Sequence, residues 1–367
     1  MFTILKQKKG EFMTENLELQ DILGTCTVAF KQRVANLIKF GNKGRFLMIR
    51  KNAELDSDFK VTEYKTSIID LPDKNLETKI KHAYFFSPAK IIVFEFKTTF
   101  ASIIEELSKI KFDWFCSLDA DNQMDAANYA KEKEIFGLVY NQKSDSKWVV
   151  SVNNPGAELA DDAVLNGSSV LEGLDLLPII GGLCAGCPYD MSITGFVIPL
   201  LKSVEMPEEI IEGQLTLYNE EEGVRVASPV NTLVTTSKNN TEDMKSITIM
   251  EGIKRFDTDV KYAFRTGYKG KFKNKYDNQQ LFVSAGKGFI RELEKADILD
   301  EEYNNNVFIN TARMRELWIA SGKSEEEVNS KSDLEIMKLS YKKLMCLKFD
   351  VKFLDAIEAC EIDVEMY

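Results

Sequence analysis

Histidine is almost absent from this sequence, which holds one, His82, in 367 residues. Serine and cysteine hydrolase triads need a histidine base beside the nucleophile. His82 lies in the amphipathic stretch IKHAYFF, and the sequence has no nucleophile-elbow motif. We therefore expect His82 to be an ordinary residue at the surface or boundary of a helix, and we expect no triad-type catalytic site.

Glycine and proline are also sparse, at 20 and 8 residues, so the chain is neither fibrous nor disordered. Basic charge is outnumbered, because 58 acidic against 47 basic residues give a net charge of −11. That balance argues against a protein that wraps nucleic acid, since phosphate contacts need a basic surface.

The longest apolar run, LDLLPIIGGLCAG, contains Asp175 and Pro178 and is too short to span a bilayer. No secretory signal begins the sequence. We expect synthesis in a reducing cytoplasm, with neither nucleic acid nor membrane as a partner.

Six cysteines are scattered along the chain, which is not the pattern of a disulfide framework. Cys184 and Cys187 have the C-x-x-C spacing that serves dithiol redox exchange or half of a zinc site. We predict this pair at the far end of a helix and before Pro188, whereas a thiolate is favoured at a helix N-terminus. The favoured interpretation is that small residues let the helix end pack closely. A dithiol oxidoreductase is kept as a third hypothesis for the function.

Residues 45–150 alternate strand and helix patterns, which is typical of an α/β layer with crossover helices. Ser169 and Glu172 have capping-box spacing, which predicts the start of an apolar helix that Pro178 should kink. A β-rich piece follows. Two long helices are predicted around 243–266 and 277–298, then a strand in NNVFIN and a short helix in DLEIMKLSYKKL.

Alternating strand patterns stand at both ends of the chain. TCTVAFKQ near the N-terminus, and LKFDVKF and EIDVEM at the C-terminus, each place apolar side chains on one face. Strands at chain ends are hard to pair locally, and an enzyme has no need of one at its last residues. The apolar faces comprise Cys26, Val28 and Phe30, then Leu347, Phe349, Val351 and Phe353, then Ile362, Val364 and Met366.

The strongest enzymatic candidate is SLDADNQMD, in which Asp119 and Asp121 directly follow a predicted buried strand. This D-x-D resembles the motif that holds a divalent metal and a nucleotide diphosphate in some glycosyltransferases. Acidic residues after a strand are more commonly turn and N-cap formers. A calcium loop is excluded, because Met124 stands where the sharp turn requires glycine. The alternative function is therefore a metal-dependent nucleotide-sugar transferase that uses Asp119 and Asp121.

A cluster of cations, VKYAFRTGYKGKFKNKY, stands out in an acidic chain. Gly270 and Lys271 lack the upstream glycine and the following Ser or Thr of a phosphate-binding loop. The cluster is either a solvated face or an electrostatic contact with an acidic protein partner. Its cations are Lys261, Arg265, Lys269, Lys271, Lys273 and Lys275.

Five stretches of residues 181–367 follow one another in a characteristic order and spacing: LCAGCPYDMSIT, EGQLTLYNEEEGVRVASPVNTLVT, KSITIMEGIKRFDTDVKYAF, GYKGKFKNKYDN and LKFDVKFLDAIE. In that order they resemble the sheath subunits of contractile phage tails and phage-tail-like bacteriocins, of the short kind seen in clostridia and related Gram-positive bacteria. No single motif is diagnostic. The resemblance is weak over residues 32–180 and resumes at TVAFKQ.

The resemblance implies an α/β fold of mixed sheets with flanking helices and extended β arms at both chain ends. It implies four parts: an N-terminal extension and arm strand (1–31), an N-proximal α/β region (32–180), a C-terminal sheath core (181–345) and C-terminal arm strands (346–367). About two dozen residues precede the first arm strand, more than is usual in sheaths. Within the first thirteen residues, KKGEFM is compatible, when back-translated, with a purine-rich bacterial ribosome-binding site just ahead of Met13, so we predict Met13 as the natural start.

The resemblance also implies partners and a location. Sheath subunits stack as six-fold rings around a tail tube, and their arms add strands to sheets of neighbouring subunits. The implied partners are other copies of the chain, the tail tube protein, and baseplate and tail terminator proteins. No cofactor, metal or enzymatic activity is expected. The implied location is a virion tail or tail-like particle assembled in the bacterial host cytoplasm.

Overall fold

The computed structural model describes residues 3–8, 11–16, 44–188, 191–227 and 229–357. The described residues form two compact units, a larger one of residues 44–254 with 354–357 and a smaller one of residues 255–353. An antiparallel hairpin of β1 (Thr3–Lys8) and β2 (Glu11–Asn16) is described by itself. Helices and sheets make up both units, and the central sheet of the larger unit is mixed, so the predicted α/β fold class is confirmed.

A six-stranded sheet is the centre of the larger unit, with the strand order β4-β5-β3-β6-β7-β8. All neighbouring pairs are parallel except β4 with β5 at one edge. The five parallel strands therefore have the 2-1-3-4-5 order of a doubly wound sheet. The strands are β3 (Arg45–Lys51), β4 (Phe59–Tyr64), β5 (Lys90–Phe96), β6 (Trp114–Ser117), β7 (Phe136–Tyr140) and β8 (Val149–Val152).

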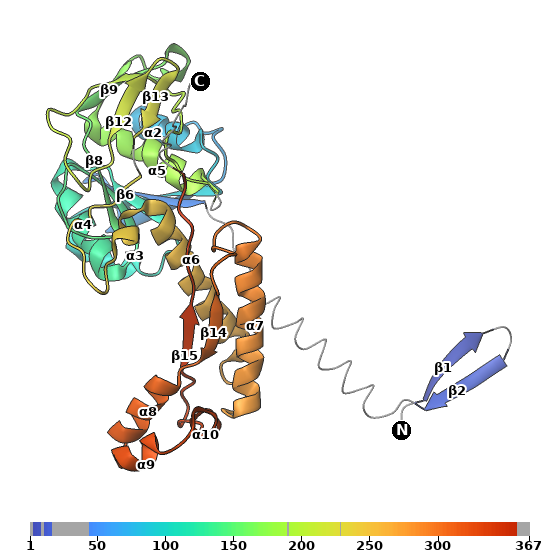
Figure 1. Cartoon of the computed structure of the whole chain (residues 1–367). Helices are drawn as coiled ribbons and strands as arrows, with labels where there is room; N and C mark the ends of the chain where they lie inside the picture. The colour runs from blue at the N-terminus through green and yellow to red at the C-terminus, as the bar shows by residue number, and fades with distance from the viewer. Residues whose placement is uncertain (1–2, 9–10, 17–43, 189–190, 228, 358–367) are drawn as a thin grey trace, which may run out of the picture. The chain divides into compact units, whose positions relative to one another are not determined.

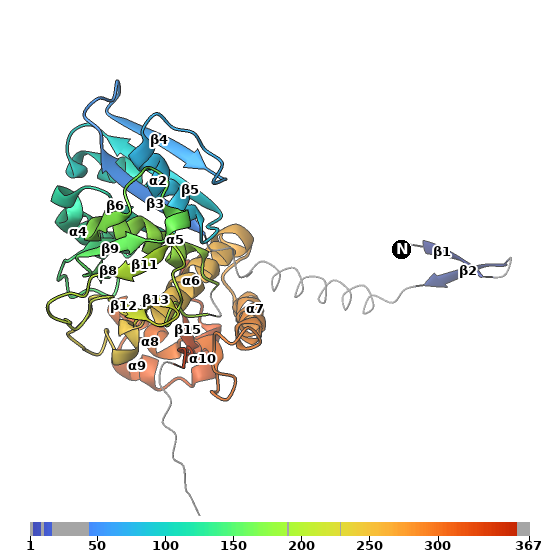
Figure 2. The same cartoon turned by 90° about the horizontal axis from the view of Figure 1, so that it is seen from above.

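Helices cover both faces of this sheet, which explains why its strands read as continuous apolar runs. Along β3, Phe46 and Met48 belong to one buried cluster and Leu47 and Ile49 to the other. The first cluster packs under α2 (Lys74–Tyr84) and α5 (Leu176–Gly186). Figure 2 shows these helices and the sheet from above. The second cluster packs under η1 (Phe100–Ile103), α3 (Ile104–Leu107) and α4 (Gln123–Lys133).

The predicted start of the apolar helix at Ser169 is wrong. Residues Val170–Glu172 form β10, and α5 begins at Leu176 after a short 3-10 turn, Gly173–Asp175. Pro178 consequently lies in the first turn of α5, where a missing N–H removes no helical hydrogen bond and gives no reason for the predicted kink. The capping-box spacing predicts a helix start from local sequence alone. Residues Val170–Glu172 instead form a strand because they pair with β9, which lies earlier in the chain.

Two small antiparallel sheets complete the larger unit, in the orders β10-β9-β11 and β12-β13. Side-chain amides join them. The amide of Asn219 both donates to and accepts from the backbone of Val204 at 2.8 Å, as a neighbouring strand would. The remaining strands are β9 (Gly156–Leu159), β11 (Leu201–Val204), β12 (Leu217–Glu220) and β13 (Gly223–Val226).

The smaller unit is built on α7 (Tyr276–Glu294), which packs against the antiparallel pair β14 (Asn306–Ile309) and β15 (Leu347–Asp350) (Figure 1). Gly286 permits the close approach, since a Cβ there would lie 3.0 Å from the side chain of Val307. The predicted long helices are confirmed as α6 (Ile247–Ala263), followed by a π-helical turn (Phe264–Tyr268), and α7. Between β14 and β15 stand α8 (Thr311–Ala320), α9 (Glu325–Asn329) and α10 (Asp333–Lys338), of which only the last was predicted.

The four assembly parts predicted for the chain have other boundaries than the two compact units. The division at 180/181 falls inside α5, within the larger unit. The two compact units are defined by contacts within one chain, whereas the four predicted parts are defined by contacts between subunits. The four-part division therefore stays a prediction. Within the described ranges, no helix is long and apolar enough to cross a membrane.

His82 is buried rather than at the surface, so its expected position is wrong. Its side chain is 4% exposed, and Nε2 lies 3.0 Å from the carbonyl oxygen of Ala163. Ala163 ends a 3-10 turn, Asp161–Ala163, some eighty positions later in the chain, and helical periodicity does not reveal such a contact. Burial lowers the pKa of His82 from its ordinary value of 6.5.

We expect stability to fall as the pH drops below 6.5, because the unfolded chain then binds a proton on His82 that the folded chain resists. His82 is the single histidine, so its imidazole proton resonances identify it without assignment. Proton NMR should give a pKa below 6.5 in the folded protein. His82→Gln should flatten the dependence of unfolding free energy on pH near 6.5, whereas an unchanged slope would contradict the burial effect.

Candidate assembly surfaces

The six cations predicted as a cluster lie on one continuous segment, residues 261–275, which we call the basic segment. It runs from the end of α6 through the π-helical turn to the start of α7. All six cations are exposed. From Lys271 to Tyr276 exposure alternates strictly, with lysines outward and the intervening side chains partly buried. Lys271, Lys273 and Lys275 therefore lie on one side of this stretch.

Aromatic rings hold the basic segment from beneath. The ring of Tyr268 lies 4.7 Å from that of Phe272 and 5.2 Å from that of Phe282 on α7. Burial raises the pKa of Tyr268 to about 12. Tyr262 and Phe264, at the end of α6 and in the π-helical turn, are large and exposed. Cations over an aromatic base are suited to bind a protein surface.

Two of the six cations form ion pairs with nearby aspartates among the described residues. Lys261 pairs with Asp257 at 2.7 Å and Lys275 with Asp277 at 3.2 Å, both exposed contacts of small energetic weight. The ammonium of Lys271 donates to the carbonyl oxygen of Thr266 at 2.6 Å, which orders the side chain without removing its charge. The surface therefore stays basic.

The predicted strand LKFDVKF is present in part as β15, and within one copy it pairs with β14. Its apolar face is also used there, because the ring of Phe256 lies 5.1 Å from Phe349 and 6.0 Å from Phe353. Leu347 and Val351 are likewise half-buried. The sheet has two strands among the described residues, so each strand keeps one edge unpaired there. Exchange between subunits at that edge stays a prediction.

The other predicted exchange residues lie outside the described residues. These are Cys26, Val28, Phe30, Ile362, Val364 and Met366.

The enzymatic alternative places Asp119 at the carboxyl end of β6, beside β3. Doubly wound sheets bind ligands at this point, where the strand order reverses. Here Oδ2 of Asp119 accepts from the backbone N–H of Lys51 at 2.7 Å and from the side-chain amide of Asn122 at 3.1 Å. Burial raises the pKa of Asp119. Asp121 is exposed. The two carboxylates are therefore not held as a pair of metal ligands.

The neighbouring charges at this end of the sheet are also used internally. Arg50, on β3, pairs with Asp73, the N-cap of α2, and with Glu95 on β5. Side-chain hydrogen bonds from Arg50 lower the pKa of Asp73, and hydrogen bonds from Asn52 and Arg50 lower that of Glu95. Among the described residues no group of three or more His, Cys, Asp or Glu side chains could hold a metal ion. The geometry does not support the transferase.

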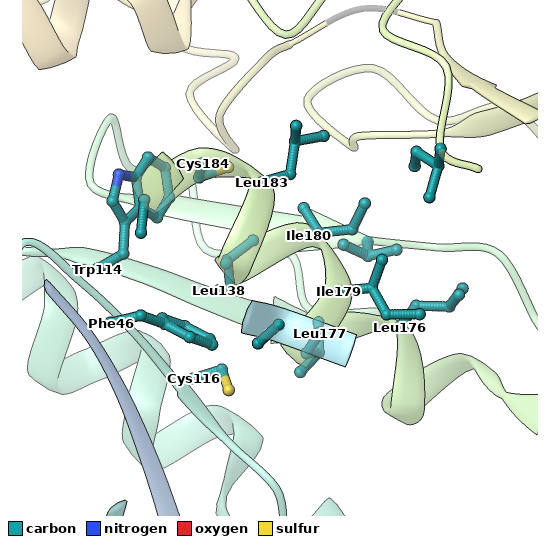
Figure 3. Close-up of a cluster of buried hydrophobic side chains, with 14 of the residues drawn as sticks. Phe46, Trp114, Cys116, Leu138, Leu176, Leu177, Ile179, Ile180, Leu183 and Cys184 are labelled. Atoms are coloured by element: carbon teal, nitrogen blue, oxygen red, sulfur yellow. The ribbon is translucent and has the colours of Figure 1, made fainter. Parts of the chain in front are cut away.

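Cys184 and Cys187 stand at the C-terminal end of α5, as predicted. The helix ends at Gly186, and the N–H of Cys187 closes it by donating to the carbonyl of Leu183 at 2.8 Å. Cys184 is 1% exposed and lies among apolar side chains (Figure 3). A buried thiol at a helix C-terminus has neither the access nor the electrostatics of a reactive one. The dithiol hypothesis gains no support.

Two solved structures that share this fold are described as sheath tail proteins. The sheath tail proteins of Listeria innocua and Desulfitobacterium hafniense each match with a TM-score of 0.60 at 12% identity, over 78% and 74% of this chain and 92% and 91% of theirs. A chain of the anti-feeding prophage baseplate matches with a TM-score of 0.60 at 11% identity, over 89% of this chain and 94% of its own. The fold is that of contractile tail sheath proteins.

Sequence comparison agrees with the fold. The tail sheath protein of Clostridium phage phiCD119 is 21% identical over 371 residues, which cover 94% of this chain and 99% of that protein. No family model matches the chain. The resemblance to the clostridial type of tail sheath protein, inferred from motif order, is thereby confirmed and extends well beyond residues 181–367.

Proposed function

We propose that this chain is the structural subunit of a contractile tail sheath, which polymerises around a tail tube and contracts to drive the tube through a bacterial envelope. The similarity to a tail sheath protein over 94% of the chain carries the proposal. The charged side chains Arg50, Asp73 and Glu95 at the carboxyl end of β3 are used in internal ion pairs, which fits a structural role without catalysis.

Strand exchange is the proposed basis of polymerisation. Added strands supply main-chain hydrogen bonds, while the apolar face of each strand sets its register. The unpaired edges of the β14–β15 sheet are suitable acceptors. Segments that link an exchanged strand to its own copy can act as hinges, so subunits move without separating. In the extended state the sheath is metastable, and contraction releases free energy as subunit contacts grow.

Electron microscopy of the purified protein tests this function. Rods, rings or striated tubes are expected. A monodisperse monomer that binds manganese and a nucleotide sugar would instead establish the transferase.

The basic segment is proposed to grip an acidic surface of the tail tube in the extended state. Its six exposed cations over an aromatic base support this role. The remaining proposed partners are baseplate and tail terminator proteins. A matching solved chain belongs to the anti-feeding prophage baseplate, which supports the first of these. The proposed location is a virion tail or tail-like particle assembled in the host cytoplasm.

Charge reversal should separate tube binding from self-assembly. Lys269→Glu, Lys271→Glu and Lys273→Glu together change the charge of the basic segment by −6 and should weaken sheath–tube association more than about tenfold at low salt. Co-sedimentation of sheath with tube measures it. The matched control reverses Lys65, Lys111 and Lys238, three exposed lysines outside the basic segment, and changes the charge by the same −6. Unchanged co-assembly of the triple variant would exclude the basic segment as the tube contact.

A further inference from the structure

Asn274 connects the basic segment to the turn that leads into β15. Its side-chain amide nitrogen lies 3.1 Å from the carbonyl oxygen of Leu344, 3.2 Å from that of Lys342 and 3.5 Å from that of Tyr341. These carbonyls stand just before β15, which begins at Leu347. One side chain in the basic segment therefore serves the backbone of a segment about seventy residues later.

The orientation of Asn274 is itself fixed. The side-chain amide of Gln279, on α7, donates to Oδ1 of Asn274 at 2.6 Å. Gln279 is 2% exposed, so it is a buried anchor. Because Oδ1 accepts from Gln279, the amide nitrogen of Asn274 has to point toward the carbonyls of residues 341–344.

The turn at 341–344 needs such a partner. Lys342 has a φ of 46°, a left-handed conformation that residues other than glycine rarely adopt. The N–H of Leu344 closes the turn by donating to the carbonyl of Tyr341 at 2.9 Å. Backbone held in this region persists when the surroundings determine it. Asn274 supplies donors to carbonyls that this turn brings together.

A neighbouring asparagine lacks this connection. The side-chain amide of Asn278 donates to the carbonyl of Lys273 at 2.8 Å, which holds the basic segment to the first turn of α7 and reaches no part of residues 341–344. The two asparagines therefore differ in one respect: both hold the basic segment, and Asn274 also holds the turn before β15.

We infer that Asn274 is a positioning residue that couples the basic segment to β15, so that an acidic partner bound to the lysines also orders the start of the C-terminal arm. The inference rests on the proposed tube contact for its role in assembly. The coupling itself belongs to the free protein and is measurable without a tube.

Hydrogen exchange in the free protein is the first test. Asn274→Ala should raise amide exchange about tenfold both at residues 269–275 and at residues 342–349, because each segment loses hydrogen bonds. Asn278→Ala should raise it at residues 269–275 alone. Gln279→Met keeps the bulk of the anchor but removes the amide that orients Asn274, and should loosen the same two segments less. If Asn274→Ala unfolds the chain, Gln279→Met decides. Unchanged exchange at 342–349 in the deciding variant overturns the inference.

Poly-glutamate is the probe for coupling in the second test. When it binds the wild-type protein, exchange should slow at both segments. In Asn274→Ala the protection at 342–349 should be lost while that at 269–275 remains, and Asn278→Ala should keep both, a pattern that a merely structural asparagine would not produce. Equal protection at 342–349 in wild type and Asn274→Ala overturns the inference. If poly-glutamate protects neither segment, the acidic-partner role of the basic segment fails, and the first test still decides the coupling.

Discussion

A chain that ends at Ile357 is expected to fold like the full chain and fail to polymerise. The deletion removes the alternating face of Ile362, Val364 and Met366, and every buried residue in the part of the chain that the structure describes precedes residue 358. A lost exchanged strand removes several main-chain hydrogen bonds per contact, which should raise the critical concentration for assembly at least about a hundredfold. Electron microscopy and sedimentation measure polymer, and circular dichroism verifies folding.

Substitutions within the full chain provide the matched comparison. Ile362→Asp with Val364→Asp places charge on the apolar face and should abolish polymer as the deletion does. Asp363→Asn with Glu365→Gln alters the polar face and should leave polymer intact. Tubes from the deleted chain at the normal critical concentration would rule out exchange through these residues.

Gly182→Ala is expected to destabilise the larger unit by about 2 to 3 kcal/mol, as overpacking in a core does. In an exposed helix the same change stabilises, by up to about 1 kcal/mol. The sign reverses here because a Cβ at Gly182 would lie 2.2 Å from the carbonyl oxygen of Ala83 on α2. A backbone atom cannot rotate away, so α5 and α2 would have to separate. Chemical denaturation measures the loss, and a stabilised variant would contradict the close packing.

The cysteines nearby supply the control for Gly182→Ala. Cys184→Ala with Cys187→Ala removes both sulfurs and adds no atom to the contact with α2. We expect a loss of about 1 kcal/mol per buried sulfur and normal assembly. Loss of assembly with the fold retained would reopen a redox or metal role for the pair.

Much of the larger unit was predictable because its strands are buried on both faces and read as apolar runs. β3 and β5 are of this kind, and both lie in the stretch 45–150 where alternating strands and helices were predicted. β4 lacks such an apolar run, because it is a charged edge strand with Phe59 and Val61 more than a third exposed. β10 was mistaken for a helix start, since three residues of strand carry too little pattern to outweigh a capping-box spacing.

The candidate surfaces also include residues that the sequence revealed and one that it did not. The sequence identified every cation of the basic segment, because long charged side chains in a polar stretch are nearly always exposed. It did not reveal Asn274, whose partners lie about seventy residues away. Lysines alternate with other residues from Lys271 to Lys275, and this pattern could have predicted that the side chain of Asn274 faces inward.

By itself, the sequence determined the α/β class, the position of the central strands, the end of α5 at Gly186 and the sheath resemblance. Each depends on residues close together in the chain or on their order along it. Only the tertiary structure decided that His82 is buried, that Asp119 ties two strands together and that Asn274 holds the turn before β15. Those facts depend on contacts between segments far apart in sequence. Local periodicity does not predict which distant segment will contact a given side chain.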